Sequence, residues 1–224
     1  MRLVTVAHGT RKASGNEVAR ELTAAAGERL GVEAVCSYVE LSDPLFEAVV
    51  AASAEATVVV PLLLSTGFHV RQDLPRMAEA AGGPLVLGRP LGPHQRIAEV
   101  QLARLVSAGA SPGAGRLVMV AAGSSDPLAT RDLTRAAELL GRLWDGPVEV
   151  ATLSALGSRP AEVVRPGDVV SPYLLSPGYF ADRARSESLD AGAVLVADVI
   201  GPDPLVADLI AQRTLALDAV RRSA

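Results

Sequence analysis

The chain has 224 residues, of which 49% are apolar and 21% charged, and its net charge is −4. This length and composition are ordinary for a folded α/β protein and exclude an intrinsically disordered chain. The acidic balance, without any clustered basic face, argues against a nucleic-acid partner. The sequence starts with neither a signal peptide nor an apolar stretch long enough to span a bilayer, so we expect a soluble, cytosolic protein with no membrane association.

The single cysteine limits the metal chemistry that is open to the chain. Cys36 lies in an apolar run, where a small buried hydrophobe is expected rather than a reactive thiol. It has no partner cysteine for an internal disulfide or a thiolate zinc site. Any metal chemistry must therefore use imidazole and carboxylate ligands.

Short runs rich in Val and Leu alternate with helical patterns in the first half of the chain. The strands predicted there are Leu3–Ala7, Ala34–Val39, Thr57–Leu64 and Leu85–Leu87. The first intervening helix is predicted to begin at a capping box, Ser14 with Glu17, and to stop at Gly31. Because these strands read as continuous rather than alternating apolar runs, we expect a parallel sheet covered by helices on both faces.

The second half of the chain repeats the first in the same order. The matching segments are Val6–Thr10 with Val120–Ser124, Ser42–Pro44 with Ser158–Pro160, Pro61–His69 with Pro172–Phe180, and Leu91–Pro93 with Ile200–Pro202. The repeat predicts an α/β protein of two similar lobes, each a parallel four-stranded sheet flanked by helices. We expect the lobes to span residues 1–109 and 116–224, joined by the Gly- and Pro-containing linker 110–115 and facing each other across a cleft.

Three polar side chains follow strands whose carboxyl ends should meet at one edge of the first sheet. His8 comes directly after the first strand, Glu40 ends the second, and His69 follows the third after a short turn. Parallel α/β sheets bind ligands outside the carboxyl ends of their strands. Two imidazoles and one carboxylate with open coordination positions suit Fe(II), Co(II) or Ni(II).

Each of these residues also has a plain structural interpretation. A histidine at a strand end is often only a hydrogen-bonded loop residue, Glu40 can be a solvated strand end, and His94 reads as a helix-start residue. The repeat favours the functional interpretation for the first three, whose matched positions are Ala122, Leu156 and Phe180. Because all three candidates are replaced by apolar residues, we expect one active N-terminal lobe and one structural C-terminal lobe.

Four blocks of sequence resemble the sirohydrochlorin chelatase family. They are His8–Arg11, Val39–Pro44, Val60–Pro75 and Leu91–His94, and they cover essentially the whole first lobe. The resemblance implies a class II, ATP-independent chelatase, a lyase that inserts iron for sirohaem or cobalt for cobalamin. It also implies that His8 and His69 are the metal-binding and proton-accepting histidines and that Glu40 is the nearby acidic residue. No His-rich tail or cluster-binding Cys motif is present, so a metal-storage role is not supported.

The chemistry of this reaction agrees with the residues. Metallation removes two pyrrole protons, which requires a base that is largely neutral near pH 7, such as histidine. Sirohydrochlorin is a polycarboxylate, and Arg11, Arg71 and Arg76 lie in the loops beside the histidines, where they could pair with its side chains. Solvation at the surface is the equally plausible alternative for each arginine.

The function expected from the sequence is insertion of a divalent metal, Fe²⁺ favoured, into sirohydrochlorin. The alternatives are cobalt insertion for cobalamin synthesis and a non-catalytic carrier of tetrapyrrole or metal. A nucleotide-binding Rossmann protein is disfavoured, because Gly9 and Gly123 lack the other glycines of that fingerprint. The chain also lacks a phosphate-binding loop, so we expect no use of ATP, no permanently bound cofactor and, with both lobes in one chain, a monomer.

Overall fold

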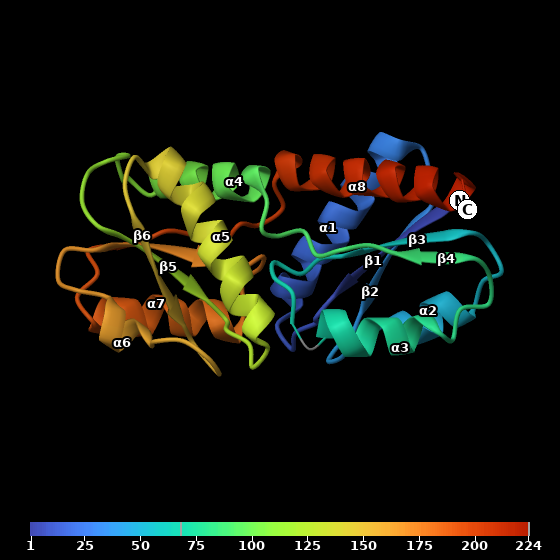
Figure 1. Ribbon diagram of the computed structural model, residues 1–224, viewed down its shortest axis with the longest axis horizontal. Coiled ribbons are helices and arrows are strands. Elements are labelled where there is room, and N and C mark those ends of the chain that lie inside the picture. Colours follow the sequence, from blue (N-terminus) through green and yellow to red (C-terminus); the bar gives the residue numbers. More distant parts are fainter. Residues whose placement is uncertain (68, 224) are drawn as a thin grey trace. The chain divides into compact units, whose positions relative to one another are not determined.

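The computed structural model describes residues 1–67 and 69–223 of the chain, with the side chain of His69 outside the described part. It contains two four-stranded sheets, each entirely parallel and each covered by helices on both faces (Figure 1). The fold class predicted from the continuous apolar runs between helical segments is therefore confirmed.

The first sheet has the strand order β2-β1-β3-β4. Its strands are β1 (Arg2–Ala7), β2 (Ala34–Tyr38), β3 (Thr57–Pro61) and β4 (Leu85–Leu87). β1 and β3 are buried along almost their whole length, which explains why their sequences are continuously apolar. Because β1 lies between β2 and β3, the chain leaves it first to one side and then to the other. The carboxyl ends of β1 and β3 thus flank a topological switch point, where α/β proteins bind ligands.

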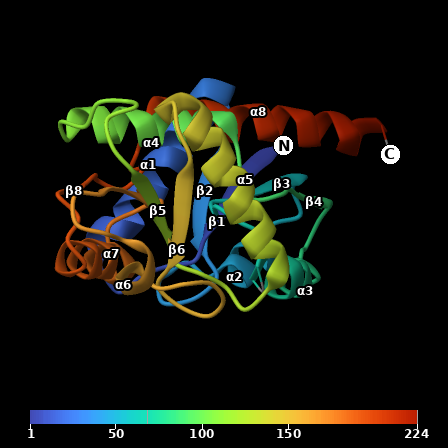
Figure 2. The ribbon, with the colours of Figure 1, turned by 60° about the vertical axis from the view of Figure 1, so that its left-hand side comes forward.

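Helices cover both faces of this sheet (Figures 1 and 2). One face carries α1 (Ala13–Leu30) and α8 (Pro204–Ser223), and the other carries α2 (Phe46–Ala51) and α3 (Leu74–Ala78). A buried apolar cluster fills the space beneath the second pair, formed by Val4, Val6, Val39, Phe46, Val50, Val59 and Leu74. Among the described residues, no helix combines the length and apolar character that crossing a membrane requires.

The start of α1 differs from the prediction, whereas its end does not. Gly31 is the C-cap residue and has a left-handed backbone, as expected. The helix begins at Ala13, however, so Ser14 lies inside the first turn and forms no capping box. The reason lies in the preceding loop, where the Thr10 hydroxyl accepts a hydrogen bond from the Lys12 backbone N–H and turns the chain before Ser14.

The second sheet repeats this architecture with the strand order β6-β5-β7-β8. Its strands are β5 (Leu117–Ala121), β6 (Val148–Thr152), β7 (Val169–Tyr173) and β8 (Leu195–Val196). The helices α4 (Gln95–Ser107) and α5 (Pro127–Trp144) cover one face, and α6 (Pro160–Val163) and α7 (Tyr179–Asp190) the other. The strand registers repeat as well, since Ala7 pairs with Tyr38 and Ala121 pairs with Thr152.

The compact units do not coincide with the lobes predicted from the sequence. Residues Met1–Leu91 pack with Pro202–Ala224, and Gly92–Gly201 form the other unit. The sequence predicted lobes of residues 1–109 and 116–224. In the structure, α4 from the first half belongs to the unit that contains most of the second half, and α8 from the second half belongs to the unit that contains most of the first. The cause is the packing of apolar faces: α8 contacts α1, β3 and β4, whereas α4 contacts α5 and β7. His94, at the start of α4, consequently lies outside the unit that contains His8.

An arginine anchors each of these two helices to a connecting segment of its own unit. On α8, Arg213 donates to the carbonyl oxygens of Leu91 and Arg89, at 2.8 and 3.1 Å. On α4, Arg104 donates through Nε and Nη2 to the carbonyl oxygen of Ile200, at 3.0 and 2.8 Å. Arg104 and Arg213 are repeat partners, and so are Ile200 and Leu91, so the sequence encodes this anchor twice.

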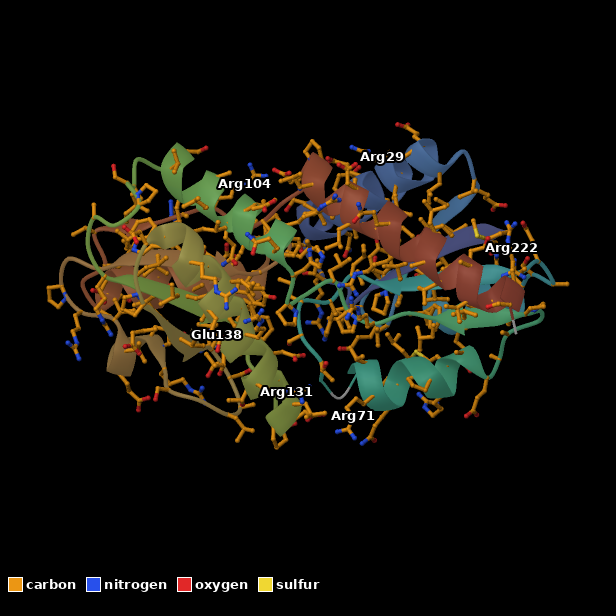
Figure 3. The ribbon with its side chains drawn as sticks, turned by 45° about the horizontal axis from the view of Figure 1, so that its top comes forward. Arg29, Arg71, Arg104, Arg131, Glu138 and Arg222 are labelled. Carbon is orange, nitrogen blue, oxygen red and sulfur yellow. The ribbon has the colours of Figure 1, made fainter. Side chains whose placement is uncertain are left out.

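We predict that Arg213→Ala lowers the free energy of unfolding by about 3 kcal/mol, because hydrogen bonds from a charged, buried donor contribute more than neutral ones. Urea unfolding measures the loss. The matched control is Arg222→Ala on the same helix, an exposed residue at its C-terminal end (Figure 3). Arg222 pairs with Asp218 one turn earlier, and its loss should cost less than about 0.5 kcal/mol. Equal losses in the two variants would contradict the anchoring role of Arg213.

Candidate metal site

His8 and Glu40 meet at the carboxyl edge of the first sheet. His8 is the first residue after β1, and Glu40 is the second after β2. The His8 Nε2 atom lies 3.5 Å from Glu40 Oε1, and the two side chains are 43% and 53% exposed. The structure thus brings these two candidate residues together at the expected edge of the sheet, where solvent species can reach both, and their role as metal ligands stays a prediction.

The hydrogen bond of the other ring nitrogen, Nδ1, decides whether Nε2 carries a proton or a lone pair. His8 Nδ1 lies 3.1 Å from the carbonyl oxygen of Gly9. A carbonyl only accepts, so Nδ1 must carry the proton in this bond, and in the neutral ring the lone pair is then on Nε2. Nε2 and the Glu40 carboxylate therefore provide two electron-pair donors 3.5 Å apart, which could serve a divalent cation as a nitrogen and an oxygen ligand.

Gly9 makes this approach of the two loops possible. Its φ is +93°, and a Cβ at this position would lie 1.9 Å from the carbonyl oxygen of Glu40. The Glu40 backbone N–H donates to the carbonyl of His8 at 3.1 Å, which continues the sheet pairing beyond the ends of β1 and β2. Any side chain at position 9 would push the Glu40 loop away from His8.

Two neighbours of Glu40 complete the local structure and were not singled out from the sequence. Leu41 has a φ of +62°, an unfavourable conformation for a residue with a side chain. Tyr38 is buried, and burial together with the side chain of Cys36 raises its pKa to about 12. Its hydroxyl therefore stays protonated at neutral pH and donates to the carbonyl of Asn16 in α1.

The third predicted ligand, His69, begins a π-helical turn, His69–Asp73, which runs directly into α3. Single π-helical turns occur frequently at functional sites. Because the His69 side chain lies outside the described residues, its distance from His8 and Glu40 stays a prediction. Within the described part of the chain, no group of three or more His, Cys, Asp or Glu side chains is placed to hold a metal.

The three candidate arginines are exposed and belong to two segments. Arg11 lies in the loop between β1 and α1, Arg71 in the π-helical turn, and Arg76 in α3. Figure 3 shows Arg71 at the N-terminal end of the segment that leads into α3. Their positions are compatible with binding an anion, and their role stays a prediction.

The second unit corrects one of the predicted repeat partners. The registers of β1 with β2 and of β5 with β6 align Glu40 with Ser154 rather than with Leu156. The equivalent of Gly9 confirms this alignment, since a Cβ on Gly123 would lie 2.1 Å from the carbonyl oxygen of Ser154. The second unit thus replaces the carboxylate with a hydroxyl, which donates to the carbonyl of Ala122. The change removes the charge without making the position apolar.

Two further expectations concern the remaining polar and aromatic positions. His94 is the N-cap residue of α4, where its Nδ1 accepts from the Arg96 backbone N–H, so its predicted helix-start role is confirmed. Phe180, the repeat partner of His69, was expected to pack in the second lobe as a buried ring. It is instead 36% exposed and stacks edge-to-face on Tyr179 at 5.5 Å, because it lies in the first turn of α7.

We predict that Gly9→Ala and Gly123→Ala both destabilise the protein by more than the about 1–2 kcal/mol that a left-handed alanine costs, because the methyl group collides with backbone in each case. Only Gly9→Ala should also weaken Co²⁺ binding, as measured by calorimetry. Gly31→Ala is the control, because its φ is also positive but its surroundings are open. Equal Co²⁺ affinities in the Gly9 and Gly123 variants would contradict the site at His8.

Comparisons with known proteins agree with this architecture. A family model described as CbiX matches residues 2–108 and again 116–217, so it matches each half of the chain. Among curated relatives, sirohydrochlorin ferrochelatase of Priestia megaterium is 28% identical over 220 residues, 88% of this chain and 82% of the relative. Sirohydrochlorin ferrochelatase of Bacillus subtilis (strain 168) is 29% identical over 205 residues, 83% of this chain and 78% of the relative.

Solved structures give the same result. SirB from Bacillus subtilis with Fe³⁺ superposes with a TM-score of 0.81 at 25% identity, covering 99% of this chain and 97% of that one. The sirohydrochlorin chelatase SirB from Bacillus subtilis subspecies spizizenii, in complex with cobalt, has a TM-score of 0.77 at 25% identity and the same coverage. CbiX from denitrifying bacteria, at 19% identity and a TM-score of 0.71 over 96% of this chain and 99% of that one, shares the fold.

Proposed function

Because the chain belongs to the CbiX family, we propose that it inserts a divalent metal, Fe²⁺ in preference, into sirohydrochlorin. The observation that carries the proposal is the His8–Glu40 pair at the carboxyl edge of the first sheet, with Nε2 and Oε1 3.5 Å apart. Two relatives that match more than four fifths of this chain are named sirohydrochlorin ferrochelatases, which supports iron as the metal.

In this proposal His8 and Glu40 hold the metal before transfer. An exposed pair of one imidazole and one carboxylate leaves coordination positions open, so the metal is delivered rather than trapped. His69 is the proposed additional ligand. The tetrapyrrole loses two pyrrole protons as the metal enters, and the lone pairs of His8 and His69, once the metal has left them, are proposed to accept one proton each. Histidine suits both roles, because its neutral form has one lone pair available near pH 7.

The substrate side chains are carboxylates, for which Arg11, Arg71 and Arg76 are the proposed partners. Guanidinium groups bind carboxylates through two parallel hydrogen bonds, and exposed positions beside the histidine loops allow this. We propose further that the reaction needs no ATP, because the sequence contains no phosphate-binding loop. A single chain with two repeated units supports a monomeric enzyme.

We predict multiple turnover when the purified protein is incubated anaerobically with sirohydrochlorin and Fe²⁺, followed by the change in the absorption spectrum of the tetrapyrrole. Addition of ATP should leave the rate unchanged. The same assay with Co²⁺ separates iron insertion from cobalt insertion, for which the cobalt-bound relative is the supporting observation. Capture of one equivalent without turnover would contradict the enzyme and indicate a carrier.

Replacing either residue of the pair should affect the chemistry and not the fold. We predict that His8→Ala and Glu40→Gln each lower kcat by about 100-fold or more, because each removes a metal ligand, and loss of a group that only orients a ligand already costs about 10–100-fold. Both side chains are about half exposed, so the melting temperature should stay close to that of the unsubstituted protein.

The second unit supplies the matched controls. Ser154→Ala and Phe180→Ala change the repeat partners of Glu40 and His69, and both should retain kcat within about twofold. Because Phe180 is partly exposed, its loss should cost about 1 kcal/mol of stability, below the 3–5 kcal/mol typical of a buried ring. A 100-fold loss of kcat in either control would show that the second unit carries chemistry of its own.

A further inference from the structure

A buried amide in the first turn of α1 joins the two loops that carry His8 and Glu40. Asn16 is only 7% exposed. Its Oδ1 accepts from the Thr10 backbone N–H at 3.1 Å, and its Nδ2 donates to the Thr10 carbonyl at 2.7 Å and to the Ser42 hydroxyl at 3.0 Å. Both donor hydrogens of the amide have a partner, so the side chain has one favoured orientation.

The hydrogen-bond partners of Asn16 lie in the two loops that carry the candidate ligands. Thr10 lies two residues after His8, and Ser42 lies two residues after Glu40. Between Glu40 and Ser42, Leu41 holds the left-handed conformation, which a residue with a side chain adopts only when its surroundings enforce it. The Glu40 N–H bond to His8 fixes one side of Leu41, and the Asn16 bond to Ser42 fixes the other.

The second unit fixes the equivalent loop by other means. Its helix α5 has Thr130 at the position of Asn16, and Thr130 is exposed. The loop there also contains a residue of positive φ, Ala155, but the guanidinium of Arg159 holds it by donating to the Ala155 carbonyl at 2.8 Å and to the Thr152 hydroxyl at 3.0 Å. The buried amide bridge is thus found in the unit that has the His–Glu pair.

We propose that Asn16 is a positioning residue that locks the His8 loop against the Glu40 loop, so that both side chains face one divalent metal. The inference deepens the proposed function and rests on it for the turnover measurement, whereas metal affinity tests it independently. Loss of the amide leaves both ligands in the chain but lets the backbone at Leu41 relax. The affinity for the metal should therefore fall.

The main experiment compares Asn16→Ala with two controls, using Co²⁺ alone as the probe in calorimetry and sirohydrochlorin with Fe²⁺ for kinetics. We expect Co²⁺ affinity to fall about tenfold, the equivalent of one hydrogen bond. We also expect kcat to fall with it, while the KM for sirohydrochlorin stays within about twofold. Thr23→Ala removes a buried hydrogen bond from the same helix and should lower the melting temperature without changing Co²⁺ affinity. Thr130→Ala should change neither the melting temperature nor the Co²⁺ affinity.

A double-variant test isolates the bond between the loops. Ser42→Ala alone should weaken Co²⁺ binding. The double variant Asn16→Ala with Ser42→Ala should bind Co²⁺ as tightly as Asn16→Ala alone, because both substitutions remove the same hydrogen bond between the loops. Additive losses would overturn the proposal, as would an unchanged Co²⁺ affinity in Asn16→Ala beside a clear loss in His8→Ala. If the unsubstituted protein binds Co²⁺ but shows no turnover, the proposed function fails, while a loss of affinity in Asn16→Ala still supports the positioning role.

Discussion

The close backbone approach of two loops underlies the candidate site. The carboxyl ends of β1 and β2 are adjacent, and the chain at Gly9 passes so near the Glu40 carbonyl that no Cβ fits between them. This contact sets the spacing between His8 and Glu40, because each ligand is attached to one of the two touching strands of backbone. Parallel pairing brings both strand ends to one edge, and the missing side chain brings the loops within reach of each other.

The layers of the fold were predictable because buried parallel strands have a direct sequence signature. The predicted and observed ranges of Leu85–Leu87 are identical, and those of the other three strands in the first sheet share their core residues. The exchange of α4 and α8 between units was not predictable in this way. Both helices present apolar faces of the same kind, and which sheet each one covers depends on long-range packing that no local pattern reports.

The candidate site was predictable where residue type and strand position decide it, and unpredictable where backbone geometry does. Imidazole and carboxylate after successive strands identified His8 and Glu40. The sequence offered no sign that Leu41 would adopt a positive φ, since leucine rarely does. It also misaligned Glu40 with Leu156, because two additional residues in the second loop shift the Ser-x-Pro match, whereas the strand register identifies Ser154.

The two units share one backbone arrangement at this loop but stabilise it with different side chains. Both keep a glycine against the partner loop and a left-handed residue after it, so this backbone arrangement is a structural requirement of the repeat, independent of any metal. The units differ in what stabilises the loop. In the second, Arg159 donates to the Ala155 carbonyl and to the Thr152 hydroxyl, which places a fixed positive charge in that loop. In the first, the neutral amide of Asn16 does this from the helix side, so the same backbone shape is held without a positive charge on the bridging group.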